Sequence, residues 1–148
     1  MRLIVLFVVL CLCACAGKQV WFEIDSNQIL YIYDGDTFTI RCQSNLRCDG
    51  DKIKVRVWGV DTPELKGKCE REIELARESK RVAVDLLRSA DSITIMYDSK
   101  HAYDKYGRLL GHVFINDVNL ANILIDSGNG REYYGGHRSG WCENITME

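Results

Sequence analysis

The sequence has little proline, no excess of basic charge and no long apolar run. One proline and 12 glycines among 148 residues argue against long disordered tracts. The formal net charge of -2 excludes the basic signature of a protein that coats nucleic acid. A nucleic-acid partner would need a local basic cleft or a bridging cation. Repeats and low-complexity segments are also missing, and the length and 47% apolar content suit one domain with one core.

The longest apolar run, residues 3–16, has 14 uncharged residues and follows a short positive start. A membrane-spanning helix needs about 20 residues, so the run is typical of a signal peptide. Cleavage before Gly17, or a lipobox-like ending at which Cys15 becomes the lipid anchor, are both open, and an uncleaved anchor is the alternative. We assign 1–16 to a signal peptide and 17–148 to one domain. The expected protein is exported: secreted, periplasmic or a membrane-anchored lipoprotein.

Four of the seven cysteines follow the predicted leader. An even number of cysteines in an exported chain indicates disulfides, and four cysteines allow three pairings. A Cys42–Cys48 bond would close a small loop and leave Cys69 and Cys142 to fasten the C-terminus. Zinc is the alternative, but these four residues contain no Cys-x-x-Cys pair and fit no zinc spacing.

Hydrophobic periodicity predicts five strands and two helices. Strands are expected where β-branched and aromatic residues gather or alternate, and helices where apolar residues recur three and four apart. Asp34-Gly35-Asp36 predicts a hairpin turn. The expected strands cover 20–33, 37–42, 53–60, 92–97 and 108–115, and the expected helices cover 69–90 and 120–127. Five strands around one interposed helix favour a small closed barrel of OB type, an α+β class with mainly β structure.

Two of three separated polar segments offer carboxylates near a strand end. Asp34 and Asp36 flank a glycine in a tight turn, and paired aspartates are hard oxygen ligands suited to Ca²⁺ or Mg²⁺. Arg56 is out of phase with the apolar residues of its strand and is expected on the polar face. Asp61 and Glu64 follow at the end of that strand, where a proline fixes the backbone.

The third polar segment is the basic and aromatic turn at residues 104–108. Its Arg108 could hold a phosphate through paired donors, and its Tyr106 could stack on a base. Each segment alone has an ordinary explanation as a solvated turn or strand end. Together they supply cation ligands, a further carboxylate and two arginines, which are the parts that phosphodiester hydrolysis needs.

The order and approximate spacing of these motifs resemble the staphylococcal nuclease family. Asp-Gly-Asp-Thr stands at 34–37, Val-Arg-x-x-Gly-Val-Asp-Thr-Pro-Glu at 55–64, and Asp-Lys-Tyr-Gly-Arg at 104–108. The resemblance implies a five-stranded OB-fold barrel with one long and one short helix. The chain ends 14 residues after Tyr134, so the final helix of the family is expected to be shortened or absent.

The resemblance also implies Ca²⁺-dependent cleavage of DNA and RNA that leaves 3′-phosphate ends. Asp36, Asp61 and the Thr62 backbone carbonyl would be the calcium ligands. Glu64 would orient or deprotonate the attacking water. The other implied residues contact substrate: Arg56 and Arg108 grip the scissile phosphate, while Lys105, Tyr106 and Tyr134 contact the nucleotide.

The expected partners are single-stranded DNA, RNA and double-stranded DNA, with no protein partner implied and a monomer expected. The main alternative is a non-catalytic nucleic-acid-binding OB-fold lipoprotein, and another is a lipoprotein with a structural or adhesive role. The presence of Asp36, Arg56, Asp61, Glu64 and Arg108 together favours an enzyme, because binding domains of this fold usually lack several of these groups.

Overall fold

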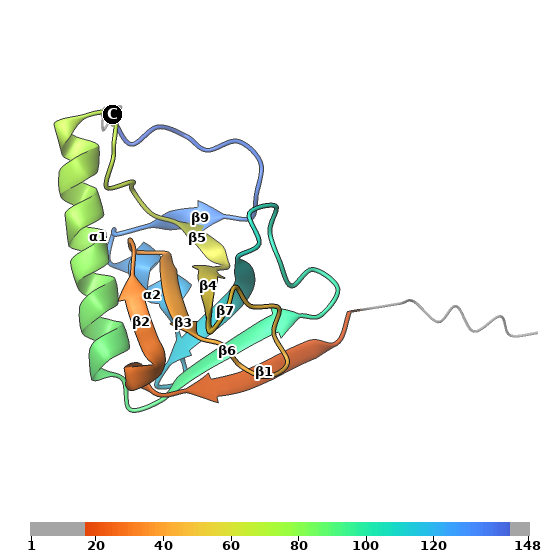
Figure 1. Cartoon of the computed structure of the whole chain (residues 1–148). Helices are drawn as coiled ribbons and strands as arrows, with labels where there is room; N and C mark the ends of the chain where they lie inside the picture. The colour runs from red at the N-terminus through yellow and green to blue at the C-terminus, as the bar shows by residue number, and fades with distance from the viewer. Residues whose placement is uncertain (1–16, 143–148) are drawn as a thin grey trace, which may run out of the picture.

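The computed structural model describes residues 17–142 as two α-helices and a curled, mainly antiparallel sheet (Figure 1). The strand order is β1-β6-β7-β4-β3-β2, with β8 added to β7, and β5 pairs separately with β9. The two ends of this order, β1 and β2, are joined by the short 3-10 helix η1. The elements are β1 (Gln19–Ile24), η1 (Ser26–Gln28), β2 (Ile29–Ile32), β3 (Thr37–Arg41), β4 (Lys52–Val57), β5 (Gly59–Asp61), α1 (Glu70–Ser89), β6 (Ile93–Asp98), β7 (Leu109–Ile115), β8 (Val118–Asn119), α2 (Leu120–Asp126) and β9 (Arg131–Tyr133).

The predicted fold class is confirmed: the domain is OB-fold-like, mainly β, with one long and one short helix. Two predicted strands are each divided in the structure. The strand over 20–33 is interrupted by η1, because polar Asp25 and Gln28 form a reciprocal capping box at this point. The strand over 53–60 ends at Val57 and resumes at Gly59, whose φ of 90° is readily adopted only by glycine.

Because η1 interrupts the first predicted strand, the two parts of that strand pair with different halves of the sheet. β1 pairs antiparallel with β6, whereas β2 pairs antiparallel with β3. The sheet therefore curls around the core, and its two edge strands are neighbours in the chain. A parallel pairing of β4 with β7 joins the two halves in the middle and brings Arg56 opposite Leu110.

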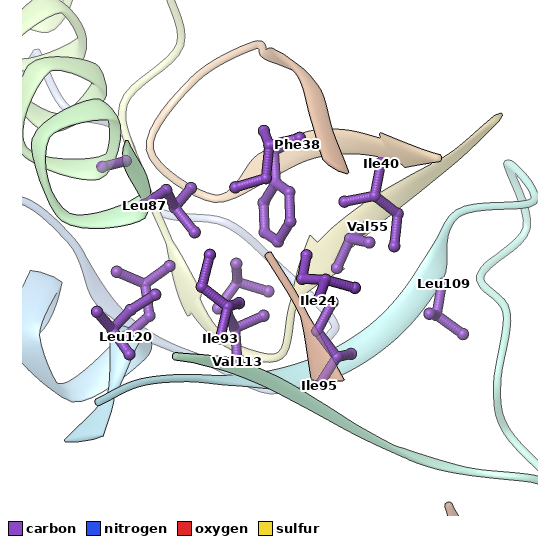
Figure 2. Packing of buried hydrophobic residues seen from close by; sticks show 14 of the residues in the cluster. Ile24, Phe38, Ile40, Val55, Leu87, Ile93, Ile95, Leu109, Val113 and Leu120 are labelled. Carbon is purple, nitrogen blue, oxygen red and sulfur yellow. The ribbon is translucent and has the colours of Figure 1, made fainter. Parts of the chain in front are cut away.

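The core fills the curl of the sheet and is closed on one side by α1 and α2 (Figures 1 and 2). Phe38, Ile40 and Val55 of the central strands are almost fully buried there. On α1 the predicted apolar stripe is present, and Ala83 and Leu87 pack into this cluster. The small residues of α1 let the helix lie close to the sheet and to the turn that precedes β3.

The described residues contain two disulfides, of which one closes an internal loop and the other fastens the C-terminal tail. Cys42 bonds to Cys48 within one loop, and Cys69 bonds to Cys142 over a sequence separation of 73 residues. Cys69 is also the N-cap residue of α1, so the second bond ties the C-terminal tail to the start of the long helix. Residues 134–142 form no helix. Within the described range no helix is long and apolar enough to cross a bilayer.

The predicted signal peptide, including its Cys15, lies outside the residues that the structure describes.

Candidate functional site

The second and third polar segments line one groove of about 970 Å³, and the first segment lies behind it, where Asp36 contacts Arg56. β4 carries Arg56 along one wall, and the turn before β7 contributes the opposite wall. The parallel register of β4 and β7 explains this meeting, because it sets the ends of two strands that are distant in sequence side by side. Five of the residues predicted from sequence line the groove: Arg56, Glu64, Lys105, Tyr106 and Arg108.

Asp36 lies at the start of β3 and is buried. Its Oδ2 accepts hydrogen bonds from the backbone N–H of Thr62 at 2.9 Å and from the Thr62 hydroxyl at 3.1 Å. Its Oδ1 accepts from the Thr37 hydroxyl at 2.9 Å, and Arg56 Nη2 lies 3.3 Å from Oδ2. These contacts fix the carboxylate and join the first polar segment to the second.

Arg56 is buried between the two candidate metal-binding aspartates. Its Nη2 lies 3.3 Å from Asp36 Oδ2 and 3.8 Å from Asp61 Oδ1. Its Nη1 donates to the carbonyls of Val57 and Val60, both at 2.7 Å. The guanidinium is therefore held rigidly by the kink between β4 and β5, with its plane set by two backbone acceptors and two carboxylates.

Asp61, at the end of β5, is almost fully buried and is surrounded by arginines. Besides Arg56, its Oδ1 lies 3.2 Å from Arg138 Nε, and its Oδ2 lies 3.3 Å from Arg131 Nη2. Oδ1 makes no hydrogen bond within residues 17–142, despite its proximity to two guanidinium groups. A buried carboxylate oxygen with an unused lone pair is a suitable ligand for a cation.

The donors around Asp36 and Asp61 fit a hard divalent cation. Two buried carboxylates and the nearby backbone of Thr62 are oxygen ligands of the kind that Ca²⁺ prefers. A second group, Cys69, Glu72 and Cys142, brings three potential ligand atoms together. It does not fit a metal in this state, because both sulfurs are consumed by the disulfide and only one carboxylate remains.

Arg108 approaches the groove from the turn before β7. Its Nε donates to Asp104 Oδ2 at 2.7 Å, and its Nη1 lies 3.4 Å from the Thr37 hydroxyl. Partial burial raises the pKa of Asp104, but hydrogen bonds from the backbone and side chain of Arg108 outweigh it and hold that pKa below its ordinary value. Arg108 thus stays paired with Asp104 through its Nε edge, and its other N–H donors remain directed toward the groove.

Aromatic rings lie at the mouth of the groove. Tyr106 is 72% exposed, and the cationic groups of Lys105 and Arg108 lie 5.1 Å and 5.4 Å from its ring centroid. Tyr134 is also exposed and does not line the groove itself. Its ring centroid lies 6.1 Å from that of Trp58, which does line the groove.

Glu64 follows the strand end and is more exposed than the predicted metal ligands Asp36 and Asp61, with 51% of its side chain exposed. Its Oε1 accepts a hydrogen bond from Arg138 Nη1 at 3.0 Å. Glu64 therefore reaches the groove as a carboxylate that water can contact, in contrast to buried Asp36 and Asp61.

Asp34 lies behind Asp36 and is also buried. Its Oδ1 accepts a hydrogen bond from the backbone N–H of Asp36 at 3.1 Å. Burial and the adjacent carboxylate of Asp36 raise the pKa of Asp34 from 3.8 to about 7. The two carboxylates of the turn therefore disfavour each other's charge, and a cation bound at Asp36 would oppose this repulsion.

Close packing against α1 fixes the turn that carries these aspartates. A Cβ on Gly35 would lie 2.0 Å from Ser79 Oγ and 2.8 Å from Thr62 Cγ2. Glycine is thus required by space and not only by turn geometry. Ser79 is fully buried, and its Oγ makes no hydrogen bond among the described residues.

Three charged residues at the site were not predicted from sequence. Asp104 belongs to a recognised turn, but its role as the partner of Arg108 depends on side-chain geometry. Arg131 and Arg138 come from β9 and from the tail, where no periodic pattern exists. The signal that could have found them is the Cys69 and Cys142 pair, since a disulfide there returns the tail toward the residues just before α1.

The fold and the groove define an OB-fold domain whose clustered carboxylates and arginines suit phosphate chemistry. Residues 54–142 match the family described as staphylococcal nuclease homologue, which is more than half of the chain. The chain therefore belongs to the staphylococcal nuclease family. The Asp34 to Thr37 turn lies before the matched range.

Two curated relatives are uncharacterized proteins. One, from Bacillus anthracis, is 32% identical over 110 residues, which are 73% of this chain and 47% of the relative. The other, from Methanocaldococcus jannaschii, is 27% identical over 126 residues, which are 72% of this chain and 58% of the relative. The chain thus spans about half the length of the curated relatives it matches.

Proposed function

We propose that this protein is an exported, Ca²⁺-dependent nuclease that hydrolyses phosphodiester bonds of DNA and RNA and leaves 3′-phosphate ends. Members of the staphylococcal nuclease family typically cleave nucleic acids. The observation that carries the proposal is the convergence of three distant segments at one groove and at the carboxylates behind it. Glu64 and two arginines line the groove, and one of them, Arg56, lies against buried Asp36 and Asp61, although more than 70 positions separate Asp36 from Arg108.

The division of labour follows from burial and exposure. Asp36 and Asp61, with the Thr62 backbone carbonyl, would hold the cation, which supplies Lewis-acid stabilisation of phosphoryl oxygens. Glu64 is accessible to water, so its carboxylate is suited to orient or deprotonate the nucleophile. Arg56 and Arg108 donate toward the phosphate and stabilise the charge that develops on it.

The bond changes define the products. The water oxygen attacks phosphorus, the bond from phosphorus to the 5′ oxygen breaks, the proton released by water is taken up near Glu64, and the leaving 5′ oxygen takes up a proton from solvent. One product then carries a 3′-phosphate and the other a 5′-hydroxyl. Exposed Tyr106 and Tyr134 offer stacking surfaces for bases, and Lys105 adds positive charge beside them.

The predicted leader and the disulfides support export. Disulfides persist in oxidising compartments and are rare in reducing ones. The charge distribution supports binding of nucleic acid at a single site. The net charge is -2, yet arginines cluster at the groove, so the protein would bind its substrate there and would not cover a long stretch of it. The lipid anchor at Cys15 and cleavage before Gly17 predict different masses for the mature protein, so intact mass spectrometry distinguishes them.

The test is degradation of denatured DNA by the wild type and by Glu64→Gln, in Ca²⁺ and in EGTA. The wild type is expected to cleave only with Ca²⁺, and Glu64→Gln should be about 10² to 10⁴ times slower because the water-positioning carboxylate is lost. The variant should melt at nearly the same temperature, since Glu64 is half exposed. Binding of DNA without cleavage by the wild type would favour the non-catalytic alternative, and equal background cleavage in all samples would exclude the nuclease.

A further inference from the structure

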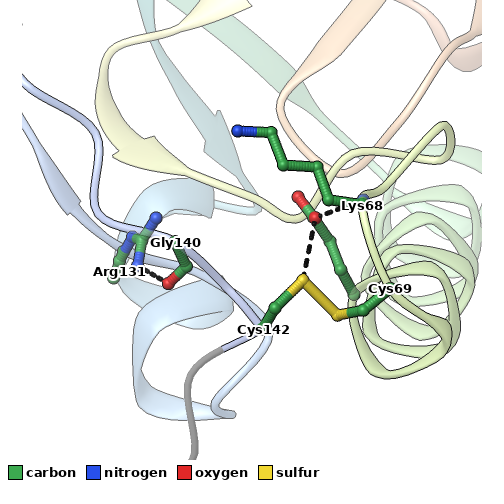
Figure 3. The surroundings of a disulfide bond; sticks show 6 residues. Lys68, Cys69, Arg131, Gly140 and Cys142 are labelled. Carbon is green, nitrogen blue, oxygen red and sulfur yellow. Dashed lines mark hydrogen bonds between the residues drawn. A yellow bond between two sulfur atoms is a disulfide. The ribbon is translucent and has the colours of Figure 1, made fainter.

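The C-terminal tail, residues 134–142, is fastened at both ends beside the candidate site. At its start, β9 pairs antiparallel with β5, with Arg131 opposite Asp61 and Tyr133 opposite Gly59. At its end, Cys142 is bonded to Cys69 at the N-terminus of α1 (Figure 3). The tail therefore spans from one side of the site to the other as a closed loop.

Arg131 holds residues 139–141 of this loop in place. Its Nη1 donates to the Gly140 carbonyl at 3.1 Å, and its Nη2 donates to the Ser139 carbonyl (Figure 3 shows the contact with Gly140). The guanidinium also lies 4.0 Å from the ring centroid of Trp141. Two backbone acceptors and one aromatic face are enough to give the loop a defined path, although it contains no regular secondary structure after Tyr133.

The defined path carries Arg138 onto two carboxylates of the candidate site. Its Nη1 donates to Glu64 Oε1 at 3.0 Å, and its Nε lies 3.2 Å from Asp61 Oδ1. The same guanidinium lies 5.2 Å from the Tyr133 ring centroid and lines the groove. Arg138 thus links the accessible carboxylate to the buried one.

The Arg138–Asp61 contact differs from an ordinary surface ion pair, whereas the Arg138–Glu64 contact joins side chains that are 39% and 51% exposed. A pair between two exposed side chains contributes little, but the Asp61 side chain is only 2% exposed. Within residues 17–142, Arg138 is also the only side chain that donates a hydrogen bond to Glu64. Without Arg138, the Glu64 carboxylate would be free to rotate in solvent.

We infer that Arg138 is a positioning residue of this site: the disulfide-anchored tail holds its guanidinium across Asp61 and Glu64 and so orients the Glu64 carboxylate toward the cation ligands. The inference rests on the proposed nuclease function. Arg138 forms and breaks no covalent bond, and it acts through Glu64 rather than on the substrate.

Two opposite effects follow from this position. Loss of Arg138 should lower kcat, because Glu64 would lose its only described orienting partner. It should also strengthen Ca²⁺ binding, because a positive charge is removed next to Asp61 Oδ1. A merely structural role would give a different pattern, with weaker Ca²⁺ binding, lower kcat and lower stability together.

The experiment compares Arg138→Gln, Arg138→Lys and the wild type. Arg81→Gln is the matched control, because Arg81 also pairs with two carboxylates but lies on α1 and does not line the groove. We would measure kcat and KM on a single-stranded oligonucleotide at saturating Ca²⁺, Ca²⁺ affinity by calorimetry without substrate, and thermal unfolding. Arg138→Gln should show a kcat about tenfold or more lower, a KM within about threefold of wild type, and Ca²⁺ affinity about two- to tenfold higher.

Arg138→Lys should recover part of the lost kcat, since lysine restores one donor but cannot bridge two carboxylates equally well. Unchanged kcat in Arg138→Gln would overturn the inference while Ca²⁺-dependent cleavage by the wild type still supported the nuclease. A loss of kcat accompanied by weaker Ca²⁺ binding and a lower melting temperature would also overturn it. An inactive wild type would instead contradict the proposed function, and the positioning role would fall with it.

Discussion

Single residues at this site lie in environments that raise the free energy of the folded protein. Asp34 is a buried carboxyl beside a second buried carboxylate, and both effects disfavour its charge. Arg56 balances Asp36 and Asp61 but does not contact Asp34 within the contacts described. Such strain is common at functional sites, where a cation or substrate later compensates it.

Asp34 gives the first prediction, on the pH dependence of stability without Ca²⁺. Its folded pKa of about 7 lies above its ordinary value of 3.8, so the folded state holds the proton more tightly. The stability that Asp34 contributes is therefore fully present below about pH 4 and is lost as the pH rises through about 7. Asp34→Asn should become steadily more stabilising, relative to wild type, across this window.

Urea denaturation in EGTA at several pH values checks this. The Asn side chain can still accept the hydrogen bond from the Asp36 backbone, so the comparison isolates the charge. Parallel stability curves for wild type and Asp34→Asn, between about pH 4 and pH 8, would show that Asp34 does not titrate in this range.

At the scale of elements, the site is built by contacts that a local sequence pattern does not contain. The hairpin turn, the strand through Val55 and Val57, and the amphipathic helix were all predicted from residue types and periodicity. The parallel pairing of β4 with β7 and the pairing of β5 with β9 were not, because pairing partners depend on packing across the whole sheet. The resemblance supplied what periodicity could not, namely that the three polar segments belong together.

The same reasoning explains what was missed. η1 divides a predicted strand because a capping box at Asp25 outweighs the β propensity around it. β9 has only three residues, and its position comes from its pairing with β5, which is distant in the sequence. Arg131 and Arg138 therefore had no recognisable pattern in sequence, although they contact Asp61.

The contact between the Asp34 to Asp36 turn and α1 gives the second prediction. Gly35→Ala would bring a Cβ to 2.0 Å from Ser79 Oγ, so the turn or the helix must shift. We expect a loss of about 1–3 kcal/mol in the free energy of unfolding, together with weaker Ca²⁺ binding because Asp36 moves with the turn.

Ser79→Ala is the matched second change. It removes the nearest clashing atom, and this atom makes no hydrogen bond within the described residues. Ser79→Ala alone should be nearly neutral, and it should recover part of the loss in the Gly35→Ala background. Strict additivity in a double-mutant cycle of denaturation free energies would contradict a direct clash.

At the scale of the whole molecule, a small domain is closed by two disulfides of very different span. Cys42–Cys48 spans 6 positions and Cys69–Cys142 spans 73. The longer crosslink removes more conformational entropy from the unfolded chain. It also joins the tail to α1, and so it affects both stability and the position of Arg138.

The third prediction compares the removal of each disulfide by paired serine substitutions. Loss of Cys69–Cys142 should cost about 2 kcal/mol more than loss of Cys42–Cys48, from loop length alone. Only the former should also alter kcat, because only that bond holds the tail at the groove. Denaturant unfolding and steady-state kinetics check both parts. Equal destabilisation, or a kinetic effect from the Cys42–Cys48 change only, would contradict this account.

We propose that buried Asp36 and Asp61, behind this groove, form a calcium site that drives phosphodiester cleavage. It is tested most directly by the rate of cleavage of a single-stranded oligonucleotide against free Ca²⁺, measured beside the Ca²⁺ binding curve of the same protein. We expect no cleavage in EGTA and a rate that rises to saturation with the occupancy of one binding site. An equal rate in EGTA and in saturating Ca²⁺ would contradict it.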